Sequence, residues 1–261
     1  ESMKQQEIYV LIIAIIVLVL GITYFLVLYL NKNKKKSVKI SISAESLLEA
    51  LGGTSNILQT NLDNKRLKIT LQNPKMVSQT LLKSTINEGD IAVDATAGNG
   101  HDTLFLAQLV GDDGFVYAFD VQKQAVDATL HRLLDNALEH RALVLKDGHE
   151  NVAKYVNKPV AGAIFNLGYL PGSDHEVITR PNTTIQALES LLKLLKIGGI
   201  IVLVIYHGHE GGKEERDEVI RFVSELPQKY IHVLRYEFLN QKNDPPFVIA
   251  LEKVKEIPAS E

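Results

Sequence analysis

The spacing of apolar and polar residues divides the chain into a long uncharged segment and a series of shorter elements. Residues 8–30 contain no charge. A helix of this length would measure about 35 Å, enough to cross a hydrocarbon core of about 30 Å, so the pattern predicts a transmembrane helix. Because lysines cluster after it at residues 32–39, the positive-inside rule places everything beyond Asn31 in the cytoplasm.

From residue 76 onward, short apolar runs alternate with segments whose apolar residues recur at helical spacing. The predicted strands are 91–95, 115–119, 142–145, 160–167, 199–206, 231–238 and 247–253, and the predicted helices are 101–110, 124–138, 182–195 and 214–226. The run at 199–206 is apolar almost throughout, as expected of a central strand covered on both faces. The last two strands are predicted to be antiparallel, because their connection is too short for a crossover helix. These elements predict an α/β fold, a doubly wound Rossmann-like sheet with a C-terminal antiparallel hairpin.

Residues 31–75 separate the uncharged segment from this sheet. Residues 31–39 form a basic linker, and residues 40–75 are predicted to form a small unit with a helix at 44–51 and a strand at 66–71. The stretch ESLLEALGGTSNILQTNLDNKRLKITLQNP resembles the start of the IIB domain of glucose-type sugar phosphotransferase systems. That family phosphorylates a cysteine just before the strand, and this chain has none. The resemblance therefore implies a degenerate docking or spacer unit.

Composition and charge narrow the possible functions. The absence of cysteine excludes disulfides, thiolate nucleophiles and Cys-ligated zinc. Residues 1–75 carry a net charge of +5, whereas residues 76–261 carry −8. The larger part is therefore not a general polyanion binder, and nucleic-acid binding would require a local basic patch or specific base contacts.

A glycine-rich turn follows the first strand of the predicted sheet, in the stretch VDATAGNGHDT. Glycines at such a turn let the backbone approach a ligand, and ligands bind at the carboxyl ends of the strands in this kind of sheet. The candidate ligand-binding residues of the turn and the helix start are Asp94, Gly98, Asn99, Gly100, Asp102 and Thr103.

The residues around the turn favour S-adenosylmethionine over a dinucleotide. Thr103 occupies the place of the third glycine in G-x-G-x-x-G, and the Asp94 carboxylate would repel a pyrophosphate. S-adenosylmethionine has no phosphate, and an aspartate can pair with its ammonium group. Asp120 ends the second strand and can accept both ribose hydroxyls, and Gln122 beside it is assigned to the same site.

The ends of the next two strands carry further candidates. In KDGHE, Asp147 is expected to accept from the adenine amino group and His149 to pack beside the ring, with a plain Asp-Gly turn that caps the next helix as the alternative. The fourth strand ends in FNLGYLPG. Asn166 and Tyr169 match the first and last members of the Asn/Asp-Pro-Pro-aromatic pattern with which amino-group methyltransferases hold a target nitrogen.

Two stretches further along the chain are assigned to the substrate side. His207 and His209, after the fifth strand, are candidate proton acceptors or phosphate contacts, and their spacing without a third ligand predicts no metal site. The stretch NDPPF at 243–247 matches the Asn/Asp-Pro-Pro-aromatic pattern better in its residue types. It lies between the last two strands, however, and is therefore expected to be a loop that walls the substrate pocket.

Taken in order, DATAGNGHDT, VYAFDVQ, FNLGYLPG, IYHGHEGGK and NQKNDPPF make residues 76–261 similar to the bacterial tRNA 5-aminomethyl-2-thiouridine methyltransferases. The resemblance implies a class I fold, a homodimer, and methyl transfer from S-adenosylmethionine to the aminomethyl nitrogen of the wobble uridine of tRNA. Asn166 would orient that nitrogen, Tyr169 would flank the uracil, and His207, His209 or Tyr169 would take the proton. The alternatives are a methyltransferase acting on rRNA, DNA or a small amine, and a membrane-anchored scaffold without catalysis.

The sequence thus predicts three parts. Residues 1–39 would be a single-pass membrane anchor with its linker, residues 40–75 a small IIB-like unit, and residues 76–261 a cytoplasmic methyltransferase domain.

Overall fold

The computed structural model describes residues 57–63, 66–71, 75–168, 179–209, 211–238, 241–242 and 244–258. The predicted membrane span at 8–30 and the predicted helix at 44–51 lie outside these residues. Within the described ranges, no helix has the length and apolar character needed to cross a bilayer.

A two-stranded antiparallel sheet precedes the main sheet in the chain. It consists of β1 (Ile57–Asp63) and β2 (Arg66–Leu71), with Asp63 opposite Arg66. The strand predicted at 66–71 is confirmed, and its partner β1 was not predicted. Because these strands cover only part of residues 40–75, the resemblance to a IIB domain remains an expectation.

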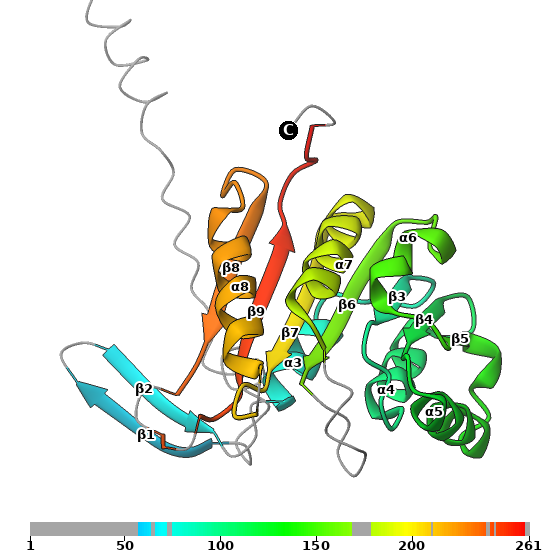
Figure 1. Ribbon diagram of the computed structural model, residues 1–261, viewed down its shortest axis with the longest axis horizontal. Helices are drawn as coiled ribbons and strands as arrows, with labels where there is room; N and C mark the ends of the chain where they lie inside the picture. Colours follow the sequence, from blue (N-terminus) through cyan, green and yellow to red (C-terminus); the bar gives the residue numbers. More distant parts are fainter. Residues whose placement is uncertain are drawn as a thin grey trace, which may run out of the picture. The chain divides into compact units, whose positions relative to one another are not determined.

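The main sheet has seven strands in the order β5-β4-β3-β6-β7-β9-β8 (Figure 1). The strands are β3 (Ile91–Asp94), β4 (Phe115–Phe119), β5 (Ala142–Leu145), β6 (Val160–Leu167), β7 (Leu195–Ile205), β8 (Ile231–Tyr236) and β9 (Phe247–Lys253). Strands β3 to β7 are parallel, whereas β9 is antiparallel to both β7 and β8. The doubly wound sheet and its terminal antiparallel hairpin are therefore confirmed.

The chain changes direction across the sheet at β3, which pairs with β4 on one side and with β6 on the other. In open α/β sheets, ligands bind outside the carboxyl ends of the strands at such a switch point. Asp94 at the end of β3 and Ile164 in β6 are direct partners, so the end of β6 lies beside the turn that follows β3.

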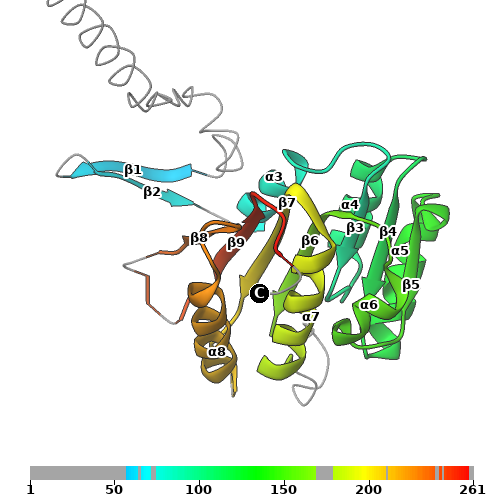
Figure 2. The ribbon, with the colours of Figure 1, turned by 90° about the horizontal axis from the view of Figure 1, so that it is seen from above.

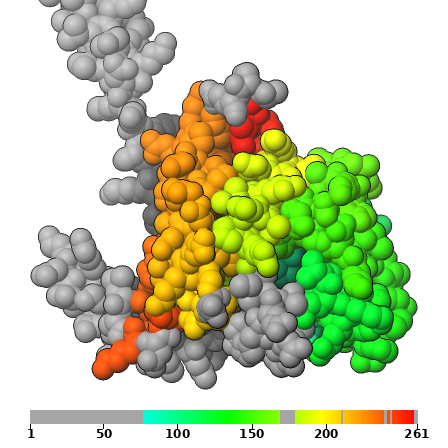
Figure 3. All heavy atoms as spheres, in the orientation of Figure 1, coloured from blue at the N-terminus to red at the C-terminus, as the bar shows by residue number. Residues whose placement is uncertain are grey.

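Helices cover both faces of the sheet, as Figure 2 shows from above. They are α3 (Lys75–Lys83), α4 (His101–Val110), α5 (Lys123–Asp135), α6 (Val152–Tyr155), α7 (Pro181–Leu194) and α8 (Gly212–Glu225). Buried residues of α3, α4 and α5 form one core with alternate strand residues such as Ala92 and Ile164. Buried residues of α7 and α8 form the other core with their neighbours Val93 and Phe165. Figure 3 shows the outer surface of α7 and α8 side by side.

Several element boundaries differ from the prediction, the largest differences being in α5 and β7, and one helix was not predicted. Helix α5 ends at Asp135 instead of 138, because Ala137 is left-handed (φ 54°) and the Leu138 N–H donates back to the Leu133 carbonyl, as in a Schellman motif. Strand β7 begins at Leu195, four residues early, with a register shift against β6. Helix α3 was not predicted, although Leu82 is fully buried in the core.

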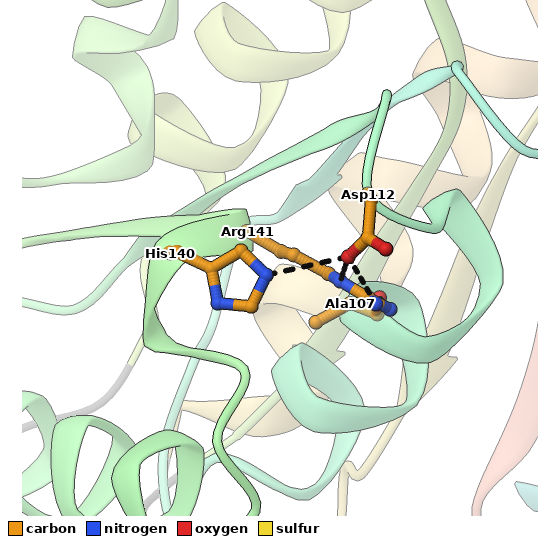
Figure 4. Close-up of polar contacts among 4 residues, drawn as sticks. All are labelled: Ala107, Asp112, His140 and Arg141. Atoms are coloured by element: carbon orange, nitrogen blue, oxygen red, sulfur yellow. Dashed lines mark hydrogen bonds and ion pairs between the residues drawn. The ribbon is translucent and has the colours of Figure 1, made fainter.

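An ion pair on the surface joins two connections at the β5 edge of the sheet. The Arg141 guanidinium donates to the Asp112 carboxylate and to the Ala107 carbonyl in the last turn of α4, and the His140 ring lies 3.3 Å from the same carboxylate (Figure 4). The His140 and Arg141 hydrogen bonds lower the pKa of Asp112. Because the carboxylate is exposed to solvent, the pair orients the connections and adds little to stability.

Candidate active site

A cavity of about 780 Å³ opens at the carboxyl ends of the parallel strands. Its walls come from the turns after β3, β4, β5, β6 and β7 and from the loop before β9. The predicted site residues that line it are Gly98, Asn99, Asp102, Asp120, Gln122, Asp147, His149, Asn166, His207 and His209. Asp94, Gly100 and Thr103 do not line it, and Tyr169 lies outside the described residues. Most of the residues predicted from separate motifs therefore surround one cavity.

The glycines of the turn after β3 have different roles. Gly98 and Gly100 are both left-handed, with φ of 54° and 77°. A Cβ at Gly100 would lie 2.7 Å from the Thr129 Cα, so this glycine allows the turn to pack against α5. Gly98 faces the cavity, and its N–H donates to Asp120 across the turn at 3.0 Å.

The Asp94 carboxylate is fully buried and holds the turn together. One oxygen accepts from the Thr103 hydroxyl at 2.6 Å, and the other accepts from the Thr96 N–H at 3.2 Å. These bonds tie the end of β3 to the first turn of α4. Direct pairing of Asp94 or Thr103 with the cofactor remains a prediction.

Asp120 connects the turn after β4 to the glycine turn. Its two carboxylate oxygens accept from the Gly98 N–H at 3.0 Å and from the Gln122 N–H at 2.9 Å, while the residue lines the cavity. Burial raises the pKa of this carboxyl, an effect that the two backbone hydrogen bonds and His149 oppose. The remaining acceptor positions of the carboxylate are available to hydroxyl groups of a ligand in the cavity.

We expect cofactor affinity to depend on the ionisation of Asp120. Hydroxyl groups donate more strongly to a carboxylate than to a carboxylic acid, so affinity should fall as the pH decreases through the pKa of Asp120. Because burial places that pKa above the ordinary 3.8, the fall should begin at a higher pH than for an exposed aspartate. Calorimetric titration with S-adenosylmethionine between about pH 4 and pH 8, where carboxyl groups of this kind titrate, measures the dependence of cofactor affinity on pH. Asp120→Asn should lack this pH-dependent component, and an identical profile in the variant would contradict the assignment.

Asp147 organises its own turn. Its carboxylate accepts from the Gly148 N–H, the Asn151 side chain and the Tyr155 hydroxyl, each at 2.8 Å. The Tyr155 bond is the main cause of its lowered pKa. The helical segments that follow have no side-chain hydrogen bond at their N-terminal caps, so the capping alternative is not borne out. A bond to an adenine amino group remains a prediction.

His149 is buried, although it also lines the cavity. Its Nδ1 lies 2.9 Å from the Ala95 carbonyl and therefore donates to it, which fixes the ring tautomer. The ring packs edge-on against Phe165 of β6, with centroids 5.5 Å apart. Burial lowers the pKa of His149, so the ring is neutral at pH 7. It thus connects the turns after β5 and β3 beneath the cavity.

Asn166 is held at both its backbone and its side chain. Its N–H donates to the Thr96 hydroxyl at 2.7 Å, and its Nδ2 donates to the Asp102 carboxylate at 2.9 Å. Since both Asn166 and Asp102 line the cavity, the end of β6 and the start of α4 form a single polar wall. The adjacency of β6 and β3 that the sequence predicted is confirmed.

A second network fixes Gly168 and was not predicted. The Gly168 N–H donates to the Thr179 hydroxyl at 2.9 Å, and its carbonyl accepts from the Thr179 N–H at 3.0 Å. The Thr179 hydroxyl in turn donates to the Glu215 carboxylate of α8 at 2.5 Å, and Thr184 donates to the other oxygen at 2.8 Å. Burial raises the pKa of Glu215, against the effect of these two bonds. A carboxylate on α8 therefore helps to fix the backbone two residues after Asn166.

Replacing Thr179 with valine should weaken this network. The buried Glu215 carboxylate loses a donor and the Gly168 N–H loses an acceptor, a change that costs about 1–3 kcal/mol. The loss of the donor should raise the pKa of Glu215 further. The variant should therefore lose more stability relative to the native chain as the pH rises through the pKa of Glu215. Thermal unfolding at several pH values measures the deficit. Thr85→Val, which removes a hydroxyl bonded to the Leu81 carbonyl, is the matched control, and equal deficits in the two variants would contradict the role of Glu215.

The two predicted histidines and the loop before β9 meet on the remaining wall. His207 is buried, packs edge-on against Phe247, and has its Nε2 3.9 Å from an Asp244 oxygen. Asp244 has a positive φ of 47°, lines the cavity, and lies 3.2 Å from the Lys213 ammonium. The predicted position of the NDPPF loop beside the pocket is confirmed for Asp244. In the described part of the chain, no group of three or more His, Cys, Asp or Glu side chains is arranged to hold a metal ion.

Comparison with known proteins gives matches over most of this region. The family model described as "Putative rRNA methylase" matches residues 116–252. A chloroplastic tRNA (mnm(5)s(2)U34)-methyltransferase of Arabidopsis thaliana is 38% identical over 188 residues, which cover 68% of this chain and 68% of that protein.

Two solved structures are similar over the same share of the chain. A putative rRNA methylase from Clostridium thermocellum is 47% identical with a TM-score of 0.69, covering 70% of this chain and 99% of its own. A putative methyltransferase from Streptococcus mutans in complex with SAH is 42% identical with a TM-score of 0.65, covering 70% of this chain and 99% of its own.

Proposed function

We propose that this chain, which belongs to the family described as "Putative rRNA methylase" and is a methyltransferase dependent on S-adenosylmethionine, acts on tRNA. In the proposed reaction, 5-aminomethyl-(2-thio)uridine at the wobble position becomes 5-methylaminomethyl-(2-thio)uridine. The fold is the class I methyltransferase fold with a mixed sheet. The observation that carries the proposal is the Asn166 amide, fixed in the wall of the cavity beside the glycine turn. The relative from Arabidopsis, named for the wobble uridine U34, supports the choice of substrate.

The cavity residues fit S-adenosylmethionine. Acceptors for its ribose hydroxyls and adenine amino group are present on Asp120 and Asp147, and the backbone of Gly98 and Asn99 lies beside them. The described lining contains one arginine, Arg180, and no lysine, in agreement with a cofactor that carries no phosphate. When bound, S-adenosylmethionine supplies a methyl group on a sulfonium, a good leaving group.

The protein's main contribution to catalysis is then alignment of the substrate nitrogen. The amine attacks through its lone pair, so an alkylammonium first loses one proton. Asn166 accepts a hydrogen bond from the amine and directs the lone pair toward the methyl group. His207 or His209, in the turn after the neighbouring strand β7, receives the proton directly or through water, and Tyr169 flanks the uracil.

The same proposal includes the wider organisation of the chain. Residues 76–261 are the catalytic domain, residues 40–75 a small IIB-like unit, and residues 1–39 a membrane anchor with its linker. The catalytic domain forms a homodimer, which assembles a tRNA surface that one acidic domain lacks. In the described residues, helix α3 begins at Lys75, next to the proposed boundary at Met76.

Nucleoside mass spectrometry of tRNA tests the reaction. Undermodified tRNA that carries the aminomethyl group is incubated with the full chain and S-adenosylmethionine, and separately with a fragment that begins at Met76. Conversion to the methylaminomethyl nucleoside by both proteins is expected. Methylation of rRNA or a free amine alone would replace the proposed substrate. A fragment that is folded but neither binds the cofactor nor methylates tRNA would favour a scaffold.

A further inference from the structure

A buried aspartate in the first turn of α4 accepts a hydrogen bond from the side chain that the proposed function assigns to the substrate amine. We infer that Asp102 is a positioning residue, which sets the orientation of the Asn166 amide in the cavity. The inference rests on the proposed function for the role of Asn166. It differs from the prediction for Asp102 from sequence, which assigned this residue to the cofactor.

The contacts define a fixed pair. Asp102 is 3% exposed, and its Oδ2 lies 2.9 Å from the Asn166 Nδ2. Its Oδ1 lies 3.4 Å from the side-chain nitrogen of Gln79 in α3. The Asn166 backbone is held separately by the Thr96 hydroxyl. Asp102 therefore controls the side-chain torsion of Asn166, while the strand and Thr96 control its backbone.

The chemistry of the pair selects one of two amide orientations. An asparagine side chain has a donor end and an acceptor end that differ little in shape, and only its partners decide which way it lies. A carboxylate has no proton to donate, so the NH₂ end faces Asp102 and the Oδ1 atom is left for a ligand. An attacking amine needs this acceptor, because a donor in the same place would bind its lone pair instead. Asp102 thus gives Asn166 the polarity that the proposed reaction requires.

Exchanging the two side chains tests the inference. Asp102→Asn removes the constraint on orientation and should lower kcat about 10- to 100-fold, with little change in cofactor Kd. Asn166→Asp should also be slow, because it places two carboxylates in contact. The double variant, Asp102→Asn with Asn166→Asp, restores a donor opposite an acceptor and again presents an oxygen to the substrate. It should recover most of the lost kcat.

A matched control comes from the opposite end of β3. The Asp90 carboxylate accepts from the Lys196 ammonium at 2.7 and 2.8 Å, away from the carboxyl edge of the sheet. Asp90→Asn should lower the thermal unfolding temperature and leave kcat unchanged. Three results would each overturn the inference. They are a normal kcat in Asp102→Asn, a lost affinity for S-adenosylmethionine with normal kcat at saturation, and a folded double variant that recovers no kcat.

A separate measurement distinguishes this inference from the proposed function. If the native chain does not methylate the aminomethyl nucleoside, the proposed function fails, and there is no native kcat with which to compare the variants. In that case, the side-chain amide signals of Asn166 in an NMR spectrum test whether Asp102 holds the Asn166 amide. Slow exchange of the bonded Nδ2 proton in the native chain, lost in Asp102→Ala, supports the pair. Equal exchange in the two proteins overturns it.

Discussion

Replacing Asn166 with alanine should lower kcat for methyl transfer by about 100-fold, the effect typical of a misplaced reacting group. Cofactor Kd should change by less than about threefold, since the Asn166 side chain, which the variant removes, bonds to Asp102 and not to Gly98 or Asp120. The variant keeps the backbone bond to Thr96 and should remain folded. Single-turnover kinetics with undermodified tRNA and calorimetric titration with S-adenosylmethionine separate the two quantities.

A control for this variant lies on the surface of the same domain. Asn136 follows α5 and donates its side-chain NH₂ to the Arg132 carbonyl, outside the cavity. Asn136→Ala should leave both kcat and cofactor Kd unchanged. Equal kcat in Asn166→Ala and the native chain would remove the observation on which the proposed function depends. A parallel loss of cofactor affinity would instead assign Asn166 to the cofactor side.

The arrangement of the site could be predicted from the sequence wherever strand ends determine it. Asn166 was placed beside the glycine turn because apolar runs marked both strands, and the order of strands in a doubly wound sheet brings β6 next to β3. The same reasoning placed Asp120 at the end of β4 and the NDPPF loop near the pocket. Periodicity determines these positions because each strand must bury its apolar residues.

Contacts between side chains on different elements could not be predicted in this way. The bond from Thr179 to Glu215 joins residues 36 apart in the sequence, and neither was assigned a role from the sequence. Asp102 was assigned to the cofactor because it follows the glycines, although its partner comes from β6. The burial of individual side chains could not be predicted either. Nothing in the letters distinguishes Asp94, which is fully buried, from Asp120, which faces the cavity.

The burial of Asp94 gives the second large expected effect. Replacing Asp94 with alanine leaves the Thr103 hydroxyl and the Thr96 N–H without this acceptor, which costs about 1–3 kcal/mol for each unpaired group. The turn that presents Gly98 to the cavity loses its anchor on α4. We therefore expect no measurable binding of S-adenosylmethionine by calorimetry. Unchanged cofactor affinity in Asp94→Ala would contradict this expectation.

A second variant separates the two ways in which Asp94 can act. Thr103→Val keeps the shape of the threonine and removes its donor, so it disturbs the anchor without touching the carboxylate itself. If Asp94 acts by holding the turn, Thr103→Val should lose a large part of the cofactor affinity as well. If Asp94 pairs directly with the ammonium group, Thr103→Val should bind normally while Asp94→Ala does not. Two observations favour the first result. The Asp94 carboxylate already accepts from two donors, one of them at 2.6 Å, and Asp94 does not line the cavity. We therefore expect Asp94 to act on the cofactor through the shape of the turn and not by direct contact.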